Sequence, residues 1–106
     1  MSKFQIFRDA RGEYRFRLVA DNGEGLLASE GYTLLRSVYA AISSIKANAG
    51  IDSRYVRKHG PSGYSFRLVA GNGEVIGTSE AYTSEEGRER GIVSVKRIAP
   101  MAVVTE

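Results

Sequence analysis

The sequence predicts an α+β fold built from two tandem β-β-β-α units, each followed by a further strand. Residues 14–33 and 64–83 are identical at thirteen of twenty positions without a gap, at an offset of fifty residues. A period of this length indicates two copies of one supersecondary unit. Each copy is too short to bury a hydrophobic core by itself. We therefore expect residues 1–106 to form a single domain with a shared core, in which repeat one covers 1–50 and repeat two covers 51–106.

Three strands are predicted at the start of the first repeat. Apolar and polar side chains alternate over residues 4–8 and 13–20, on either side of a turn at residues 9–12. The dipeptide Asn22-Gly23 then favours a two-residue type I′ hairpin turn, because both central residues of that turn need a positive φ. The third strand of the hairpin is expected over residues 25–31.

A helix is predicted to follow this hairpin. Thr33 is the expected N-cap, and behind it apolar residues recur every three or four positions as far as residues 48–50. Residues 51–58 are expected to be extended, and they either close the first repeat, open the second, or do both.

The second repeat is predicted to contain the same elements. Asn72-Gly73 lies at the tip of its hairpin, and Thr83 and Glu86 have the spacing of a helix capping box. The helix is expected to end near Ile98, and the β-prone residues 101–105 are predicted to form a last strand.

The second helix carries a thinner apolar stripe than the first. Arg88 stands where the first helix has Val38, and Gly87 and Gly91 lower the helix propensity. We expect this helix to be the less deeply packed of the two, unless Arg88 forms an ion pair with a carboxylate such as Glu85.

The amino-acid composition argues against several classes of function. The chain has no cysteine, so disulfide and thiolate chemistry are excluded. No apolar stretch approaches the length of a membrane span, and the first residues lack the apolar segment of a signal peptide, so we expect a cytoplasmic protein that does not contact a membrane. The formal net charge of +3 arises from fifteen basic and twelve acidic residues, a mixture too even to require a polyanionic partner.

A two-residue turn fixes which residues oppose one another across the hairpin. With this register Arg15 faces Glu30, Arg17 faces Ala28, and Val19 faces Leu26. The face that carries Phe16 and Leu18 is expected to be covered by the helices. The opposite face is expected to present a candidate interaction surface of arginines and apolar side chains from both repeats: Arg15, Arg17, Val19, Leu26, Arg67, Val69 and Ile76.

Three interpretations of this surface remain open. Its arginines could form cross-strand charge pairs with Glu30 and Glu80, which would make them structural. Its apolar residues could contact a partner, or they could be covered by strand ends or a loop. A basic patch for phosphate is the third interpretation, but the aromatic residues alternate away from the arginines, whereas nucleic-acid binding needs both kinds of side chain on one face.

Residues repeated in the two halves resemble the YegP-like, or DUF1508 (UPF0339), family in a tandem two-repeat form. The resemblance rests on Phe16-Arg17-Leu18, Asn22-Gly23-Glu24, Ser29-Glu30-x-Tyr32 and Ile42-x-Ser44-x-Lys46, and on their counterparts fifty residues later. It implies one continuous, mostly antiparallel sheet with the two helices on one face, and an exchange between repeats of the strands that follow the helices. It carries over no catalytic residue.

Candidate catalytic groups are few in this chain. His59 is the only histidine and lies in a glycine- and proline-containing turn, and Ser29 and Ser79 have no neighbouring base in the sequence that would activate a hydroxyl. No metal-ligand spacing is present. We expect no enzymatic activity, no cofactor and no bound metal. The expected function is that of a binding or structural module for a protein or small ligand, with weak sequence-independent nucleic-acid binding as the alternative. A monomer is expected, with a homodimer as the alternative.

Overall fold

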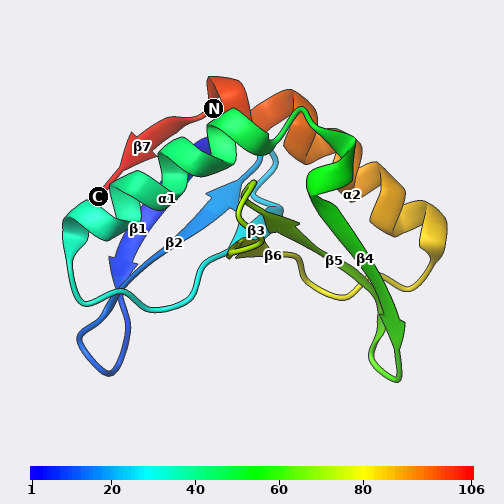
Figure 1. Cartoon of the computed structure of the whole chain (residues 1–106), viewed down its shortest axis with the longest axis horizontal. Coiled ribbons are helices and arrows are strands. Elements are labelled where there is room, and N and C mark those ends of the chain that lie inside the picture. Colours follow the sequence, from blue (N-terminus) through cyan, green and yellow to red (C-terminus); the bar gives the residue numbers. More distant parts are fainter.

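The computed structural model, which describes residues 1–106, has a seven-stranded sheet with two α-helices on one face (Figure 1). Its elements are, in order, β1 (Lys3–Arg8), β2 (Tyr14–Val19), β3 (Gly25–Ala28), α1 (Leu35–Asn48), β4 (Tyr55–Gly60), β5 (Gly63–Val69), β6 (Val75–Thr78), α2 (Glu85–Ile98) and β7 (Val103–Thr105). Short 3₁₀ turns, Asp52–Arg54 and Ala99–Met101, follow the two helices.

The strand order β4-β5-β6-β3-β2-β1-β7 places the two repeats side by side in one sheet. The repeats meet at β3 and β6, where Ala28 pairs with Thr78. Every pairing is antiparallel except that of β7 with β1. The strand that follows each helix lies in the half of the sheet opposite to that helix's own repeat: β4 follows α1 and pairs with β5, and β7 follows α2 and pairs with β1. The predicted fold class, including this exchange, is therefore confirmed.

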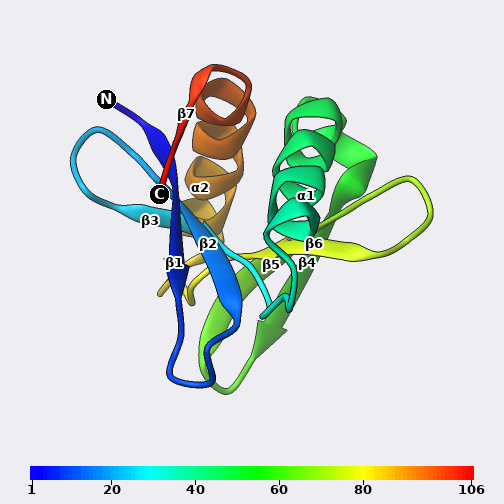
Figure 2. The same ribbon diagram turned by 90° about the vertical axis from the view of Figure 1, so that its left-hand side faces the viewer.

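Both helices pack across the boundary between the repeats. The two ribbons run side by side over the same face of the sheet (Figure 2). The first helix contacts β2 of its own repeat and β5 and β6 of the other, and α2 contacts β5 and β3. Residues of both repeats, among them Phe4, Phe16, Ile45, Phe66 and Val95, form one hydrophobic core of 20 buried side chains. Neither helix is long and apolar enough to cross a membrane.

The hairpin turns differ from the predicted two-residue type. Ala20 N–H donates to Glu24 O, and Gly23 N–H donates to Ala20 O, each at 2.9 Å. Gly23 has φ +86°, and no residue other than glycine has a positive φ. These features describe a three-residue loop made of a type I turn closed by a glycine bulge. Gly73, with φ +87°, closes the second hairpin in the same way.

The bulge beside each hairpin turn changes the face of the sheet on which Leu26 and Ile76 lie. Arg17 opposes Ala28 as predicted, but Val19 opposes Gly25 because the register shifts by one residue between Leu18 and Val19. Two consecutive residues of each short strand are therefore buried, and the prediction that Leu26 and Ile76 lie on the open face is wrong. A bulge of this kind leaves one extra residue on one strand and so reverses the alternation beyond it.

The helix N-caps lie one residue later than predicted. Leu34, not Thr33, precedes α1, and no side chain caps that helix. Ser84, not Thr83, caps α2, and its hydroxyl accepts from Gly87 N–H at 3.0 Å. A serine at this position satisfies one of the free backbone donors of the first turn.

The second helix is packed as closely as the first, contrary to the expectation. Arg88 is only 6% exposed, and its guanidinium reaches Glu89 at 3.0 Å and Glu85 at 3.3 Å. It also donates to Lys58 O at 3.2 Å and lies 5.6 Å from the centroid of the Tyr64 ring. The alternative of an ion pair is therefore correct, and these partners compensate the burial of the charge.

A candidate binding surface on the open sheet face

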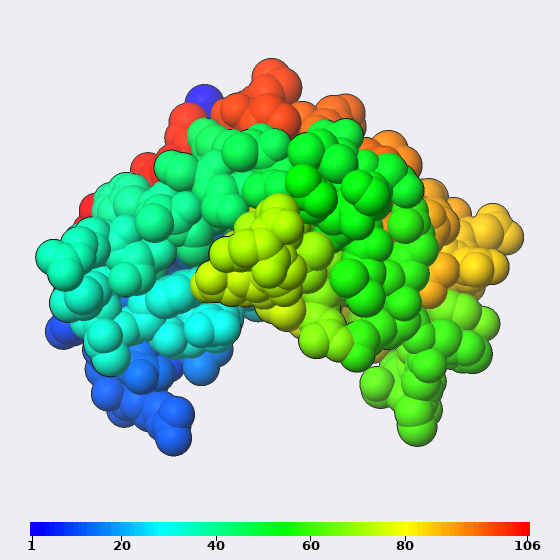
Figure 3. Space-filling view, viewed as in Figure 1, coloured from blue at the N-terminus to red at the C-terminus, as the bar shows by residue number.

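The sheet face opposite the helices is uncovered, and the strands curve into an arch (Figure 1). The β1–β2 and β4–β5 tips project from the two ends of this arch, and the space-filling view shows the hollow between them (Figure 3). The short strand β7 lies at the sheet edge beside β1 and does not cover this face. We call this concave surface the open face.

Alternation along the strands places basic side chains on the open face. Phe4, Ile6, Phe16 and Phe66 are buried under the helices, so their neighbours in sequence point to the other side. The strands contribute no acidic side chain there, and Glu30 and Glu80 follow β3 and β6. The basic side chains of the open face are Lys3 on β1, Arg15 and Arg17 on β2, Lys58 on β4 and Arg67 on β5.

Arg15 is held by Asp9 and not by Glu30. Its Nε lies 2.7 Å from Asp9 Oδ2, and its Nη1 donates to Ser29 O at 3.2 Å. The Asp9 carboxylate also accepts from the backbone N–H groups of Arg11 and Glu13. Together the Arg15 side chain and these amides hold the pKa of Asp9 below its usual value. The predicted opposition of Arg15 and Glu30 therefore gives no ion pair.

The other two predicted arginines make no ion pair with a carboxylate. The Arg17 guanidinium lies 4.4 Å from the centroid of the Phe7 ring, a cation–π contact on an exposed strand face. Arg67 is half-buried and opposes Val56 on one side and Thr78 on the other. Both guanidiniums consequently keep free donors toward the open face.

A hollow of about 310 Å³ lies on the first-repeat half of this face. Arg15, Arg17 and Phe7 line one part of it, and Glu80 reaches it from the second repeat. The remainder is lined by small residues of the central strands, including Ala28 and Thr78, and by the buried residues Phe16, Leu26 and Leu27 beneath them. The hollow thus presents two guanidiniums and one carboxylate beside a small apolar area, an arrangement that can bind acidic groups in an extended chain.

The structure brings together only part of the predicted interaction surface. Arg15 and Arg17 share the hollow, Arg67 lies on the other half of the open face, and Val19 and Val69 are half-buried near the hairpin tips. Sequence reasoning missed Phe7, although its position after the core residue Ile6 indicates the open face.

The groups weighed for catalysis have structural roles. Ser29 and Ser79 are buried, and each hydroxyl accepts from the N–H of Phe16 or Phe66 at 2.9 Å. The His59 ring stacks on Tyr64, with centroids 4.0 Å apart and planes 3° from parallel. No cluster of three or more histidine, aspartate or glutamate side chains is placed to hold a metal ion.

A family model described as a domain of unknown function, DUF1508, matches residues 9–55 and 56–106. A UPF0339 protein encoded in the ptx operon 5′ region of Stutzerimonas stutzeri is 49% identical over 104 residues, which cover 97% of this chain and 94% of that protein. The UPF0339 protein Atu0232 of Agrobacterium fabrum is 54% identical over 54 residues, which are half of this chain but 87% of that protein. That relative therefore corresponds to roughly one repeat.

Two solution NMR structures share the fold. The protein of unknown function YegP from Escherichia coli superimposes with a TM-score of 0.92 at 35% identity, covering 98% of this chain and 90% of that chain. The UPF0339 protein SO3888 from Shewanella oneidensis also gives a TM-score of 0.92, at 30% identity, with coverage of 98% and 89%. The likeness extends over both repeats.

Proposed function

This chain belongs to the DUF1508 family of domains of unknown function. From the geometry of the structure we propose that it is a non-enzymatic module whose open face binds an acidic segment of a protein partner. The observation that carries the proposal is the charge of that face. Five strand side chains are basic, none is acidic, and of the five only Arg15 is in an ion pair. An acidic partner would supply the missing counter-charges and associate faster through electrostatic attraction.

The shape of the hollow supports a polypeptide as the occupant. Small residues of the central strands, such as Ala28 and Thr78, let an extended chain approach the sheet. Arg17 can bind a carboxylate through two N–H groups, whereas Arg15, whose Nε and Nη1 are already bonded, keeps only Nη2 free for a further contact. Glu80 at the opposite side offers an acceptor for a backbone or basic group of the same segment.

Nucleic acid fits this face less well. Single strands are bound by free aromatic rings on which bases stack, beside cations for the phosphates. Phe7 is the only aromatic side chain that the strands place on the open face, and the Arg17 guanidinium already lies over its ring. A base would have to displace this guanidinium before it could stack.

The proposal is tested by fluorescence anisotropy with two probes of equal charge. One is a labelled peptide of alternating glutamate and threonine, and the other is labelled oligothymidylate. We expect saturable peptide binding that is lost in the double variant Arg17→Ala, Arg67→Ala. The matched control is Arg36→Ala combined with Arg90→Ala, which removes the same charge from exposed positions on the helices.

Three outcomes would contradict the proposal. Loss of peptide binding in the control as well as in the double variant would show an effect of net charge alone. Tighter binding of oligothymidylate, with affinity falling steeply as salt rises, would favour the nucleic-acid alternative. Absence of saturable peptide binding at low salt would remove the proposed role.

A further inference from the structure

Two crevices lie on the helix side of the sheet, and the internal repeat relates them. The first, of about 340 Å³, lies between α1 and the hairpin turn of the second repeat. The other, of about 300 Å³, lies between α2 and Glu24 in the hairpin turn of the first repeat. Each crevice therefore combines the helix of one repeat with the turn of the other. Neither crevice shares a residue with the hollow on the open face.

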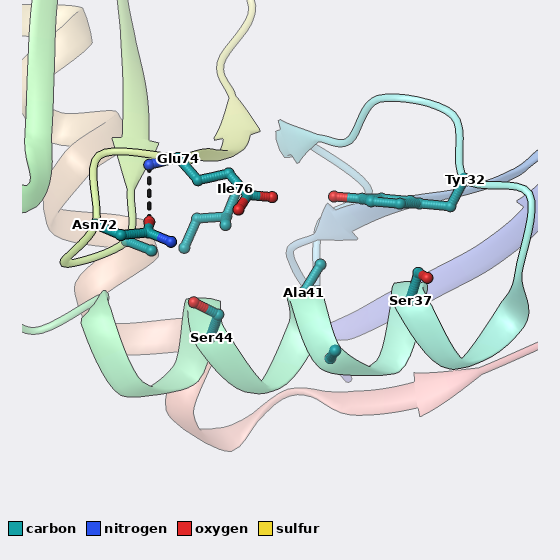
Figure 4. Close-up of a pocket in the computed structure, with 9 residues that line it drawn as sticks. Tyr32, Ser37, Ala41, Ser44, Asn72, Glu74 and Ile76 are labelled. Atoms are coloured by element: carbon teal, nitrogen blue, oxygen red, sulfur yellow. Dashed lines mark hydrogen bonds between the residues drawn. The ribbon is translucent and has the colours of Figure 1, made fainter.

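Polar groups from three elements converge on the first crevice. Tyr32 lies just before α1, Ser37 and Ser44 lie on α1, and Glu74 follows the turn. Figure 4 shows the Glu74 carboxylate and the Tyr32 hydroxyl pointing toward one another across the opening, with Ser44 on the helix below. The Asn72 side chain fixes the turn by accepting from Glu74 N–H at 2.9 Å.

Three polar residues at the crevices are the same in both repeats. Tyr32, Ser44 and Glu74 line the first crevice, and their counterparts Tyr82, Ser94 and Glu24 line the second. Neither glutamate forms an ion pair or a side-chain hydrogen bond that stabilises the fold. The duplicated carboxylate thus has no structural partner, although the duplicated asparagine beside it does.

The two crevices differ in charge. Ala40 lines the first crevice, and Arg90 stands at the corresponding position of the second. No basic side chain lines the first crevice, so the Glu74 carboxylate is its only charge. Burial and the nearby carboxylates Glu30 and Glu74 raise the pKa of the Tyr32 hydroxyl, so the group adds no second negative charge to the crevice.

We propose that the first crevice binds the primary ammonium group of a small organic amine or of a lysine side chain. An ammonium group has three N–H donors and no acceptor. Glu74 supplies the counter-charge, and the hydroxyl oxygens of Tyr32 and Ser44 accept the remaining donors. The volume accommodates an aliphatic amine of a few carbons, and the apolar side chains Ala41 and Ile76 line the space for its methylene groups.

The second crevice is the internal control for this site. The Arg90 guanidinium lines this crevice together with Glu24 and repels a second cation. The Tyr82 hydroxyl there is buried against Gly91 and has no hydrogen-bond partner. We therefore expect an amine to bind the first crevice and not the second.

A ¹H–¹⁵N NMR titration of the whole chain with putrescine tests the site. We expect saturable shifts of the amides of Tyr32, Ser44 and Glu74, without matching shifts at Tyr82, Ser94 and Glu24. Nα-acetyl-lysine methylamide forms the second arm. Saturation by this compound alone assigns the site to a protein lysine, and saturation by putrescine alone assigns it to free amines. Succinate, of the same length and opposite charge, should cause no saturable shift.

Three variants test which residues are responsible for amine binding. Glu74→Gln should weaken amine binding by roughly 10- to 100-fold, because a charge-assisted hydrogen bond is lost. Glu24→Gln makes the same change in the second crevice and should leave the affinity unchanged. Ala40→Arg should abolish binding by placing the cation of the second crevice in the first. Equal shifts at both crevices, unchanged binding by Glu74→Gln, or no saturable shift with either amine would overturn the proposal.

Discussion

The side chain of Leu27 lies over Gly77, which is the residue that corresponds to Leu27 in the second repeat. A Cβ atom built on Gly77 would lie 3.2 Å from Leu27 Cδ1 and 3.3 Å from Cδ2. These residues belong to β3 and β6, the two strands at which the repeats meet. One large side chain therefore fills the space at the centre of the pseudo-symmetric sheet, and the repeats must differ there because two leucines would overlap.

This relationship predicts the result of exchanging the two residues. Gly77→Leu should destabilise the fold by about 1–3 kcal/mol through overpacking, and Leu27→Gly should cost at least the ~2–5 kcal/mol of a large-to-small core substitution. The double exchange restores one leucine and one glycine, so it should unfold closer to the wild type than either single variant. Urea denaturation of all four proteins measures this coupling. Additive losses would show that the two sites are independent.

A second close approach involves Tyr82 and Gly91 on α2. A Cβ atom at Gly91 would lie within van der Waals overlap of the Tyr82 hydroxyl and of the ring carbon that bears it. Gly91→Ala should therefore lower stability by about 1–3 kcal/mol, even though alanine has the higher helix propensity by ~1 kcal/mol. The comparison is Ala41→Gly at the equivalent position of α1, where the loss of helix propensity and of one buried methyl group is expected. A gain in melting temperature for Gly91→Ala would contradict this interpretation.

The sequence could predict the fold, but it could not place every residue on a face. Thirteen identities in the repeated segment and two amphipathic helices are sufficient for two like units with a shared core. Gly23 at the hairpin tip is compatible with either a two-residue type I′ turn or a three-residue loop with a bulge. The two kinds of loop differ in length by one residue. The longer loop, with its bulge, places Leu26 and Ile76 in the core and not on the open face.

The candidate sites were predictable to different degrees. Alternation alone placed Arg15, Arg17 and Arg67 on the open face, because β2 and β5 are regular over these residues. The first crevice was missed because Glu74 and Ser44 meet only when α1 packs across the other repeat's turn. The ion pair of Arg88 with Glu85 was predicted as an alternative, because the two residues are three apart on one helix. Its pairing with Glu89 was missed, because the geometry of adjacent helical residues depends on the tertiary packing.

Neighbouring positions of the hairpin loops are expected to tolerate substitution to different degrees. Gly23→Val should destabilise markedly, because a β-branched side chain is strongly disfavoured at φ +86°. Asn22 has a negative φ, and its side-chain oxygen accepts from Glu24 N–H at 2.9 Å. Asn22→Asp retains this acceptor and should be tolerated, whereas Asn22→Gly should lose about 0.5–1.5 kcal/mol. Thermal unfolding of the three variants checks the order, and a more damaging Asn22→Asp would contradict the loop assignment.

Glu89 predicts a pH dependence of stability. Hydrogen bonds from Arg57, and then from Arg88, lower the pKa of its carboxyl group below the usual 4.5. A lowered native pKa means that the stabilisation is fully present above the unfolded-state pKa and is lost as pH falls through the native value. Glu89→Gln should therefore cost about 1 kcal/mol at pH 7, a small figure because the Glu89 side chain is 40% exposed.

The same variant should differ less from the wild type in acid. Below the native pKa of Glu89 both proteins carry a neutral group at this position, so their free energies of unfolding should converge. Urea unfolding at pH 7 and at pH 3 measures the difference. A constant difference across this range would show that Glu89 contributes through packing and not through its charge.

A single repeat should not fold as a monomer. In the intact chain α1 covers strands of the other repeat, and β7 of the second repeat pairs with β1 of the first. A fragment of residues 1–60 keeps β1 to β4 but exposes the face of α1 that rests on β5 and β6, together with the edge of β3 that pairs with β6. Such exposed apolar surface and free strand edge favour association with a second copy. Sedimentation velocity combined with thermal melting should show either a dimer or a chain without a cooperative transition. A cooperatively melting monomer would mean that the core of one repeat is sufficient and that the exchange of strands is not needed for folding.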